Sequence, residues 1–111
     1  MKITNMQAVI FYNSVKEFSQ KRLPINVLWA LKYNFNVITS QVQTYEELRK
    51  GIGAGDGRIT PELEKLLSEE AEHNVKKIKM EDLKVLDDLS AGYDKLTLAE
   101  LDSISFMIEE E

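Results

Sequence analysis

Apolar residues recur every three or four positions over the first fifty residues, in two runs separated by a short polar link. The first run follows Thr4 and Gln7, whose spacing forms a capping box at the start of a helix. The second run begins at Pro24, which suits a first helical turn because proline there loses no hydrogen bond. Its apolar stripe comprises Ile25, Leu28, Leu31, Phe35, Ile38, Val42, Tyr45 and Leu48. The pattern predicts two helices, over 5–20 and 25–50, that form an antiparallel hairpin.

Glycines interrupt the pattern after the second helix. Between positions 51 and 57 every second residue is glycine, and each one adds backbone entropy that a helix would have to suppress. We therefore predict a flexible loop over 51–59. Thr60 before Pro61 is a good N-cap, and the leucines that follow predict a short helix that ends near residues 73–74.

The remaining chain carries weaker signals for short elements. Residues 75–80 alternate between apolar and basic side chains, which indicates a short strand or an extended link. A helix is expected over 81–90, with Gly92 as its stop. Thr97 and Glu100 form a second capping box, and the helix that it opens is expected to bury one face. That face comprises Leu98, Leu101, Ile104 and Met107 or Ile108.

The chain has 111 residues, which is too few for two independent cores, and its 43% hydrophobic content is typical of a protein that folds. The expected architecture is mainly α: an N-terminal antiparallel helical hairpin with a long second helix, a glycine-rich loop, and three shorter helices with room for one short strand. We expect a single domain over 1–111. Its parts are the hairpin (1–50), the glycine loop (51–59) and an acidic helical part (60–111).

Charge divides the chain into a basic front and an acidic back. Residues 1–58 hold eight Lys/Arg against four Asp/Glu, whereas residues 59–111 hold six against fifteen, and the formal net charge is −5. This balance argues against nucleic acid and anionic membranes as partners. Two explanations stay open: the opposite halves attract each other within the fold, or the acidic surface meets a basic partner.

Patterns for catalysis, metal binding and targeting are weak. The segment 56–62 resembles the later half of a calcium loop, but the position of the terminal glutamate falls on Leu63. His73 with Glu69 offers half of a zinc site, and the chain has no cysteine to complete it. No apolar leader or membrane-length apolar run is present. We expect no enzymatic activity, no metal or other cofactor, no membrane partner and a cytoplasmic location.

The second helix provides candidate interface residues. Trp29, Tyr33 and Asn36 lie off its main stripe, and large aromatics there are either second-face core or interface anchors. The helix would be about 39 Å long and its hairpin partner about 24 Å, so part of its apolar surface is left over. Either the acidic helices cover that surplus, or the chain associates with itself as a homo-oligomer.

A second candidate site is basic. Arg49, Lys50 and Arg58 flank the glycine loop, whose backbone amides are suited to phosphate oxygens. This combination predicts, as an alternative function, a protein that sequesters an anionic nucleotide. The loop lacks the ending of a P-loop and follows no clear strand, so the pattern also fits a passive connection.

Several local motifs occur together: the Lys-Arg-Leu-Pro turn at 21–24, Lys32-Tyr33-Asn34, and the segment 62–83. In this order they resemble a family of small proteins of unknown function encoded by phages and prophages of Gram-positive bacteria. The resemblance implies a viral origin, a place in the host-cell cytoplasm and no known catalytic residues. The expected function is therefore a phage-encoded binding protein that contacts itself and a host or phage protein, as an inhibitor of host defence or an assembly helper.

Overall fold

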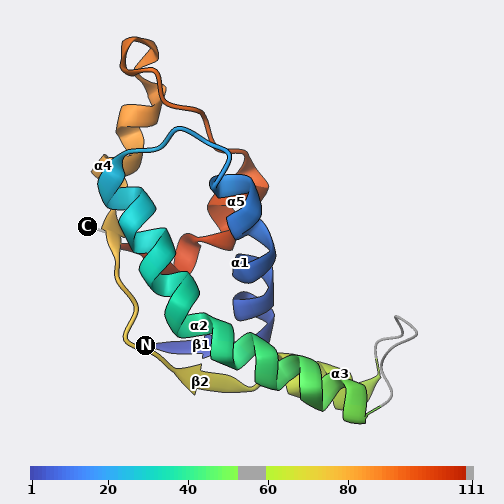
Figure 1. Cartoon of the computed structure of the whole chain (residues 1–111). Helices are drawn as coiled ribbons and strands as arrows, with labels where there is room; N and C mark the ends of the chain where they lie inside the picture. Colours follow the sequence, from blue (N-terminus) through green and yellow to red (C-terminus); the bar gives the residue numbers. More distant parts are fainter. Residues whose placement is uncertain (53–59, 110–111) are drawn as a thin grey trace.

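The computed structural model describes residues 1–52 and 60–109, and it confirms a mainly α fold (Figure 1). In chain order the elements are β1 (Lys2–Thr4), α1 (Asn5–Phe18), α2 (Ile25–Gly51), α3 (Pro61–Ser68), β2 (Glu70–Glu72), β3 (Ile78–Lys79), α4 (Met80–Lys84), the 3-10 turns η2 (Val85–Asp87) and η3 (Leu89–Ala91), α5 (Leu98–Ser103), the 3-10 turn η4 (Ser105–Met107) and β4 (Ile108–Glu109). Residues 53–59 of the predicted glycine loop lie outside the described residues. Within the described ranges, no helix combines the length and apolar character needed to cross a membrane.

The predicted helical hairpin is confirmed. The Thr4 hydroxyl accepts a hydrogen bond from the Gln7 amide at 3.0 Å, and the Gln7 side chain accepts one from the Thr4 amide at 2.9 Å. This capping box fixes the start of α1. Pro24 is the N-cap of α2, where its φ of −55° leads the chain into the helix. α1 and α2 run in opposite directions and pack against each other (Figure 1).

The buried face of α2 is rotated from the predicted stripe. Four stripe residues are buried: Leu31, Ile38, Val42 and Tyr45. Three others are exposed: Ile25, Leu28 and Leu48. Their places toward the core are taken by Val27, Ala30, Asn34 and Gln41. The prediction followed the largest apolar side chains, whereas the fold buries a small residue and two amides, and buried amides are tolerated where they are hydrogen-bonded.

α3 begins where the sequence predicts and ends earlier. The Thr60 hydroxyl accepts a hydrogen bond from the Leu63 amide at 3.2 Å, with Pro61 as the first helical residue. The predicted end near residues 73–74 is wrong, because the helix stops at Ser68 and the chain then forms β2. β2 pairs antiparallel with β1, with Ala71 opposite Ile3. Local sequence could not show this pairing, since the partner strand lies about seventy residues earlier in the chain.

The last third of the chain is more irregular than the sequence predicts. β3 lies within the segment predicted as a strand, and it pairs in parallel with β4. The helix predicted over 81–90 is wrong in length, because α4 covers five residues and continues as 3-10 turns. Gly92 stops this segment as predicted, with a left-handed φ of 77° that glycine accepts without steric cost.

The second capping box is confirmed, but its helix is short. The Thr97 amide donates to the Glu100 carboxylate at 2.8 Å, and the Glu100 amide donates to the Thr97 hydroxyl at 3.2 Å. α5 ends at Ser103, so the predicted continuous face is wrong. Ile104, between α5 and η4, and Met107, in η4, are buried, while Leu98 is exposed.

One main core joins the hairpin to the C-terminal elements. The rings of Phe11 and Phe106 meet edge to face, with centroids 5.3 Å apart. A smaller cluster of Tyr45, Leu63 and Leu66 forms where α3 packs against the C-terminal half of α2. α3 therefore covers one side of that end of the long helix, while Leu48 stays exposed. The outer face of the N-terminal half of α2 stays open.

Polar contacts connect the C-terminal residues 93–109, termed the tail below, to the link between α1 and α2. The Lys21 ammonium lies 3.3 Å from the Glu100 carboxylate and donates to the Lys95 carbonyl at 2.9 Å. The Arg22 amide donates to the Asp94 carboxylate at 2.7 Å, and the Asp94 amide donates to the Arg22 carbonyl at 2.9 Å. Of these contacts, the Lys21–Glu100 pair joins a basic side chain of residues 1–58 to an acidic side chain of residues 60–109.

Candidate functional site

The outward face of α2 carries exposed apolar side chains near the start of the helix. Trp29 is 57% exposed and Ile25 is 73% exposed, and Leu28 and Tyr33 are also open to solvent. Because an α-helix turns every 3.6 residues, these positions point away when positions 27, 31 and 34 point into the core. Ile25, Leu28, Trp29 and Tyr33 are termed the α2 row below.

An apolar groove of about 180 Å³ lies beside the α2 row, between α1 and α2. Its lining includes Val15, Phe18 and Ser19 from the end of α1, and Leu28, Leu31 and Phe35 from α2. Pockets for drug-sized ligands begin at about 300 Å³, so this groove is smaller than a typical substrate site. It has room for one bulky apolar side chain.

Lys32 provides the charge at this surface. It lines the groove, and its ammonium lies 5.3 Å from the centroid of the Trp29 ring, which is a cation–π distance. No carboxylate belongs to the α2 row or to the groove lining. The surface is therefore apolar with one positive charge.

The structure places the predicted interface residues together. Trp29, Tyr33 and Asn36 are all exposed on the outer side of α2. Sequence reasoning missed Ile25 and Leu28 as members of this surface, because it assigned both to the core stripe. The signal that could have separated them is the alternative spacing of Val27, Ala30, Leu31, Asn34 and Ile38, which also follows a helical period.

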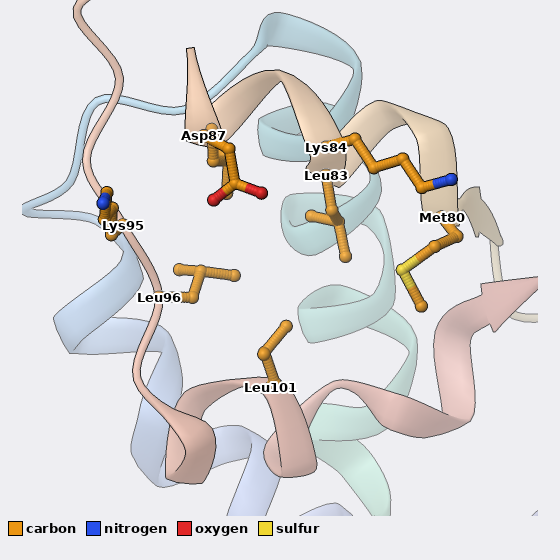
Figure 2. A pocket seen from close by; sticks show the side chains of 8 residues that line it. Met80, Leu83, Lys84, Asp87, Lys95, Leu96 and Leu101 are labelled. Carbon is orange, nitrogen blue, oxygen red and sulfur yellow. The ribbon is translucent and has the colours of Figure 1, made fainter. Parts of the chain in front are cut away.

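A second pocket, of about 230 Å³, lies between α4 and α5 (Figure 2). Leu83 and Leu101 point into it from opposite walls, and the Asp87 carboxylate points toward the same space. The Lys84 ammonium lies away from Asp87, near Met80 (Figure 2). The charged groups of the lining are the Asp87 carboxylate and the ammonium groups of Lys84 and Lys95, and the other lining residues are apolar.

A polar network links β1, α1, α2, α3 and His73, the residue that follows β2. His73 Nε2 and Gln41 Oε1 are 2.6 Å apart, and because an amide oxygen only accepts, His73 Nε2 carries the hydrogen. Gln41 Nε2 donates to Asn5 Oδ1 at 2.8 Å and to the Ile3 carbonyl at 3.0 Å. Asn5 Nδ2 donates to the Leu66 carbonyl at 2.7 Å. Each amide hydrogen bond joins two elements, so the network holds the fold.

The pKa of His73 is lowered in this network. Burial is the larger cause, since it disfavours the charged ring, and the nearby α-amino group of Met1 lowers the pKa further. The Glu72 carboxylate raises it by a smaller amount. His73 is therefore neutral near pH 7 and serves as a hydrogen-bond donor. Across the described residues, no three His, Asp or Glu side chains gather closely enough to hold a metal ion.

The candidate anion-binding residues are only partly described. Arg49 forms an ion pair with Glu46 at 2.9 Å, one turn earlier in α2. Lys50 lines a shallow surface hollow together with Glu46 and Glu47, and these carboxylates repel an anion. Arg58 lies outside the described residues. The nucleotide site stays a prediction.

The chain matches no protein-family model, and neither a curated protein nor a solved structure shows significant similarity to it. The fold and the surface together define a small, mainly helical protein with an exposed apolar row on its longest helix. Function is therefore inferred from the chemistry of that row.

Proposed function

We propose that this chain is a non-enzymatic binding protein that acts by protein–protein contact through the α2 row and the adjacent groove. The observation that carries the proposal is the exposure of Trp29 at the centre of an apolar row on a long helix. Trp and Tyr dominate binding hot spots because they bury a large area at little conformational cost. A contiguous apolar patch on a folded monomer marks an interaction site.

The partner at this surface is a second copy of the chain. Accessible aromatic side chains offer roughly 150–250 Å² each, so the partly exposed row presents on the order of 400 Å². Stable interfaces bury about 800 Å² per partner, so this smaller area fits only a weak, reversible dimer. The row has no carboxylate that would require a basic partner, and like apolar surfaces can meet across a two-fold axis.

The resemblance to phage and prophage proteins extends the proposal to a biological setting. A self-associating binding protein of that origin fits an assembly helper or an inhibitor of a host defence protein. In either role the dimer would contact a further host or phage protein, without a membrane, nucleic acid or cofactor.

Trp29 gives a direct test because it is the single tryptophan of the chain. Its emission should shift to shorter wavelengths as the protein concentration rises from about 1 μM to about 500 μM, while sedimentation shows conversion to a dimer. A chain that stays monomeric, with unchanged emission, over this range would contradict the proposal.

Tyrosine variants supply a matched comparison. Tyr33→Ala removes one member of the α2 row and should weaken association by about 2 kcal/mol, or roughly 30-fold. Tyr93 has a similar exposure, 36% against 41%, but lies in the link before α5. Tyr93→Ala should leave the dimerisation constant unchanged. Equal effects of the two variants would show that the α2 row is not the contact.

A further inference from the structure

We infer that the two α2 helices of the pair run parallel, and that Trp29 of each copy inserts its indole ring into the apolar groove of the other. The inference rests on the proposed function, because it assigns the groove an occupant supplied by a second copy. The groove is then a receptor for one aromatic side chain, and each copy completes the site of its partner.

The groove and Trp29 lie on opposite sides of the outward face of α2. Consecutive residues of an α-helix are about 100° apart around the axis. Leu28 lines the groove beside α1, and Trp29 is therefore rotated about 100° away from it. Ile25 and Lys32 are exposed between the two sides, and Asn36 is exposed about 20° around the axis from Trp29.

Two-fold symmetry decides how these two sides meet. In an antiparallel pair, the two-fold axis is perpendicular to both helices, and each side of α2 faces the same side of α2 in the other copy. The groove then faces the other groove, and the indole faces the other indole. In a parallel pair, with the axis along the helices, each side meets the opposite one, so both indoles enter both grooves. Only the parallel pair fills the groove, and filling is favoured because an empty apolar space forfeits contacts with its lining.

The lining of the groove fits an indole ring. The volume of about 180 Å³ accepts one large side chain, and Phe18 and Phe35 offer aromatic surfaces for edge or offset contacts. Lys32 also lines the groove, so its ammonium can lie over the partner's ring as it now lies over Trp29 of its own chain. The two Lys32 charges approach each other near the axis, which opposes association and keeps the pair weak.

Cysteine cross-linking separates the two directions, and the chain has no natural cysteine to interfere. In the parallel pair, Asn36→Cys places two thiols at the same height on facing helices, within reach of a disulfide, which needs Cα atoms about 4.4–6.8 Å apart. In an antiparallel pair centred on Trp29, the same thiols are about 21 Å apart. The matched control is Asn74→Cys, an exposed asparagine in the link between β2 and β3, outside the α2 row and the groove lining. We expect Asn36→Cys to cross-link at least about tenfold faster at concentrations where the dimer forms.

A groove-filling variant tests the occupant. Ser19→Phe adds a ring at the groove wall and should weaken dimerisation about tenfold or more, with Trp29 emission staying at long wavelength at high concentration. Ser68→Phe is its control, because both serine hydroxyls donate to a carbonyl three residues earlier near a helix end, at 2.7 Å and 2.8 Å. Far-ultraviolet circular dichroism checks that each variant folds.

The outcomes distinguish the inference from the proposed function. Fast Asn36→Cys cross-linking together with a selective effect of Ser19→Phe supports the parallel, groove-filled pair. A dimer whose Asn36→Cys variant cross-links no faster than Asn74→Cys overturns the parallel arrangement and leaves self-association standing. A wild-type chain that is monomeric throughout overturns both.

Discussion

Residues 1–52 and residues 60–109 are built in different ways. The first region consists almost entirely of α1 and α2, whereas the second divides into elements of eight residues or fewer. Isolated helices of that length are marginal in water, so the second region keeps its shape through what it touches. The hairpin is the scaffold of the molecule, and the later elements depend on specific contacts with it (Figure 1).

The aromatic contact between Phe11 and Phe106 joins the two regions, and a variant at this contact tests whether they unfold together in one transition. Phe11 is fully buried, so Phe11→Ala should lower the free energy of unfolding by about 4 kcal/mol through lost burial and a cavity. Urea unfolding followed by circular dichroism and by Trp29 emission should show one coincident transition. Separate transitions for the two probes would show that the tail unfolds by itself. Leu98→Ala, at an exposed site, should change stability by less than about 0.5 kcal/mol.

The Lys21–Glu100 ion pair tests how firmly charge fastens the tail. Glu100 is buried, so Glu100→Ala leaves Lys21 without its partner and removes a helix cap, and we expect a loss of about 2 kcal/mol. Burial raises the pKa of Glu100, but hydrogen bonds from Thr97 and the Lys21 charge lower it more, so the net shift is downward.

The lowered pKa of Glu100 fixes the sign of its pH effect. Its contribution is present above the usual carboxylate range near pH 4 and is lost as pH falls through the lower folded-state pKa. Glu100→Gln keeps the capping geometry but cannot titrate. Urea midpoints for wild type and Glu100→Gln should therefore converge as pH falls from 7 to about 2. Parallel pH profiles for the two proteins would contradict this reading of the ion pair.

Asn34 fastens the link before β3 to α2 through its amide. The Asn34 Nδ2 donates to the Lys76 carbonyl at 2.8 Å, and the Asn34 Oδ1 accepts from the Lys76 amide at 2.7 Å. Asn34→Ala should cost about 2 kcal/mol, because it leaves two backbone groups without partners. Hydrogen exchange at the Lys76 amide should accelerate in step. Asn36→Ala, two residues along on the exposed face, is the control, and an equal loss there would contradict the assignment.

The contrast between the two regions also explains what the sequence could predict. Helix starts at Thr4, Thr60 and Thr97 were predictable because capping acts between residues three apart. The pairing of β1 with β2 was not, because it joins segments about seventy residues apart in the chain and neither strand has a strong local pattern. The burial of Asn34 depends on a backbone partner that no helical period reveals.

The candidate site divides in the same way. Trp29, Tyr33 and Asn36 were predicted because a helical wheel places them off the stripe. The groove beside them was not, because it exists only once Phe18 and Leu28 are brought together by the packing of α1 on α2. Exposure of the α2 row likewise depends on which elements cover α2. α3 packs only against the C-terminal half of α2, away from the α2 row.

We expect the smallest change in stability from the protonation of His73. This change should not alter the outer face of α2. Its pKa is lowered chiefly by burial, so the unfolded chain binds the proton more readily, and stability falls as pH drops below about 6.5, the ordinary value for histidine. His73→Gln keeps a donor toward Gln41 without a charge and should flatten the urea midpoint between pH 7.5 and 5.5. A magnetic resonance titration that places the His73 pKa above its ordinary value would contradict the sign. Trp29 emission should not change over this pH range, because Gln41 lies twelve residues, or about 18 Å, along the helix from Trp29.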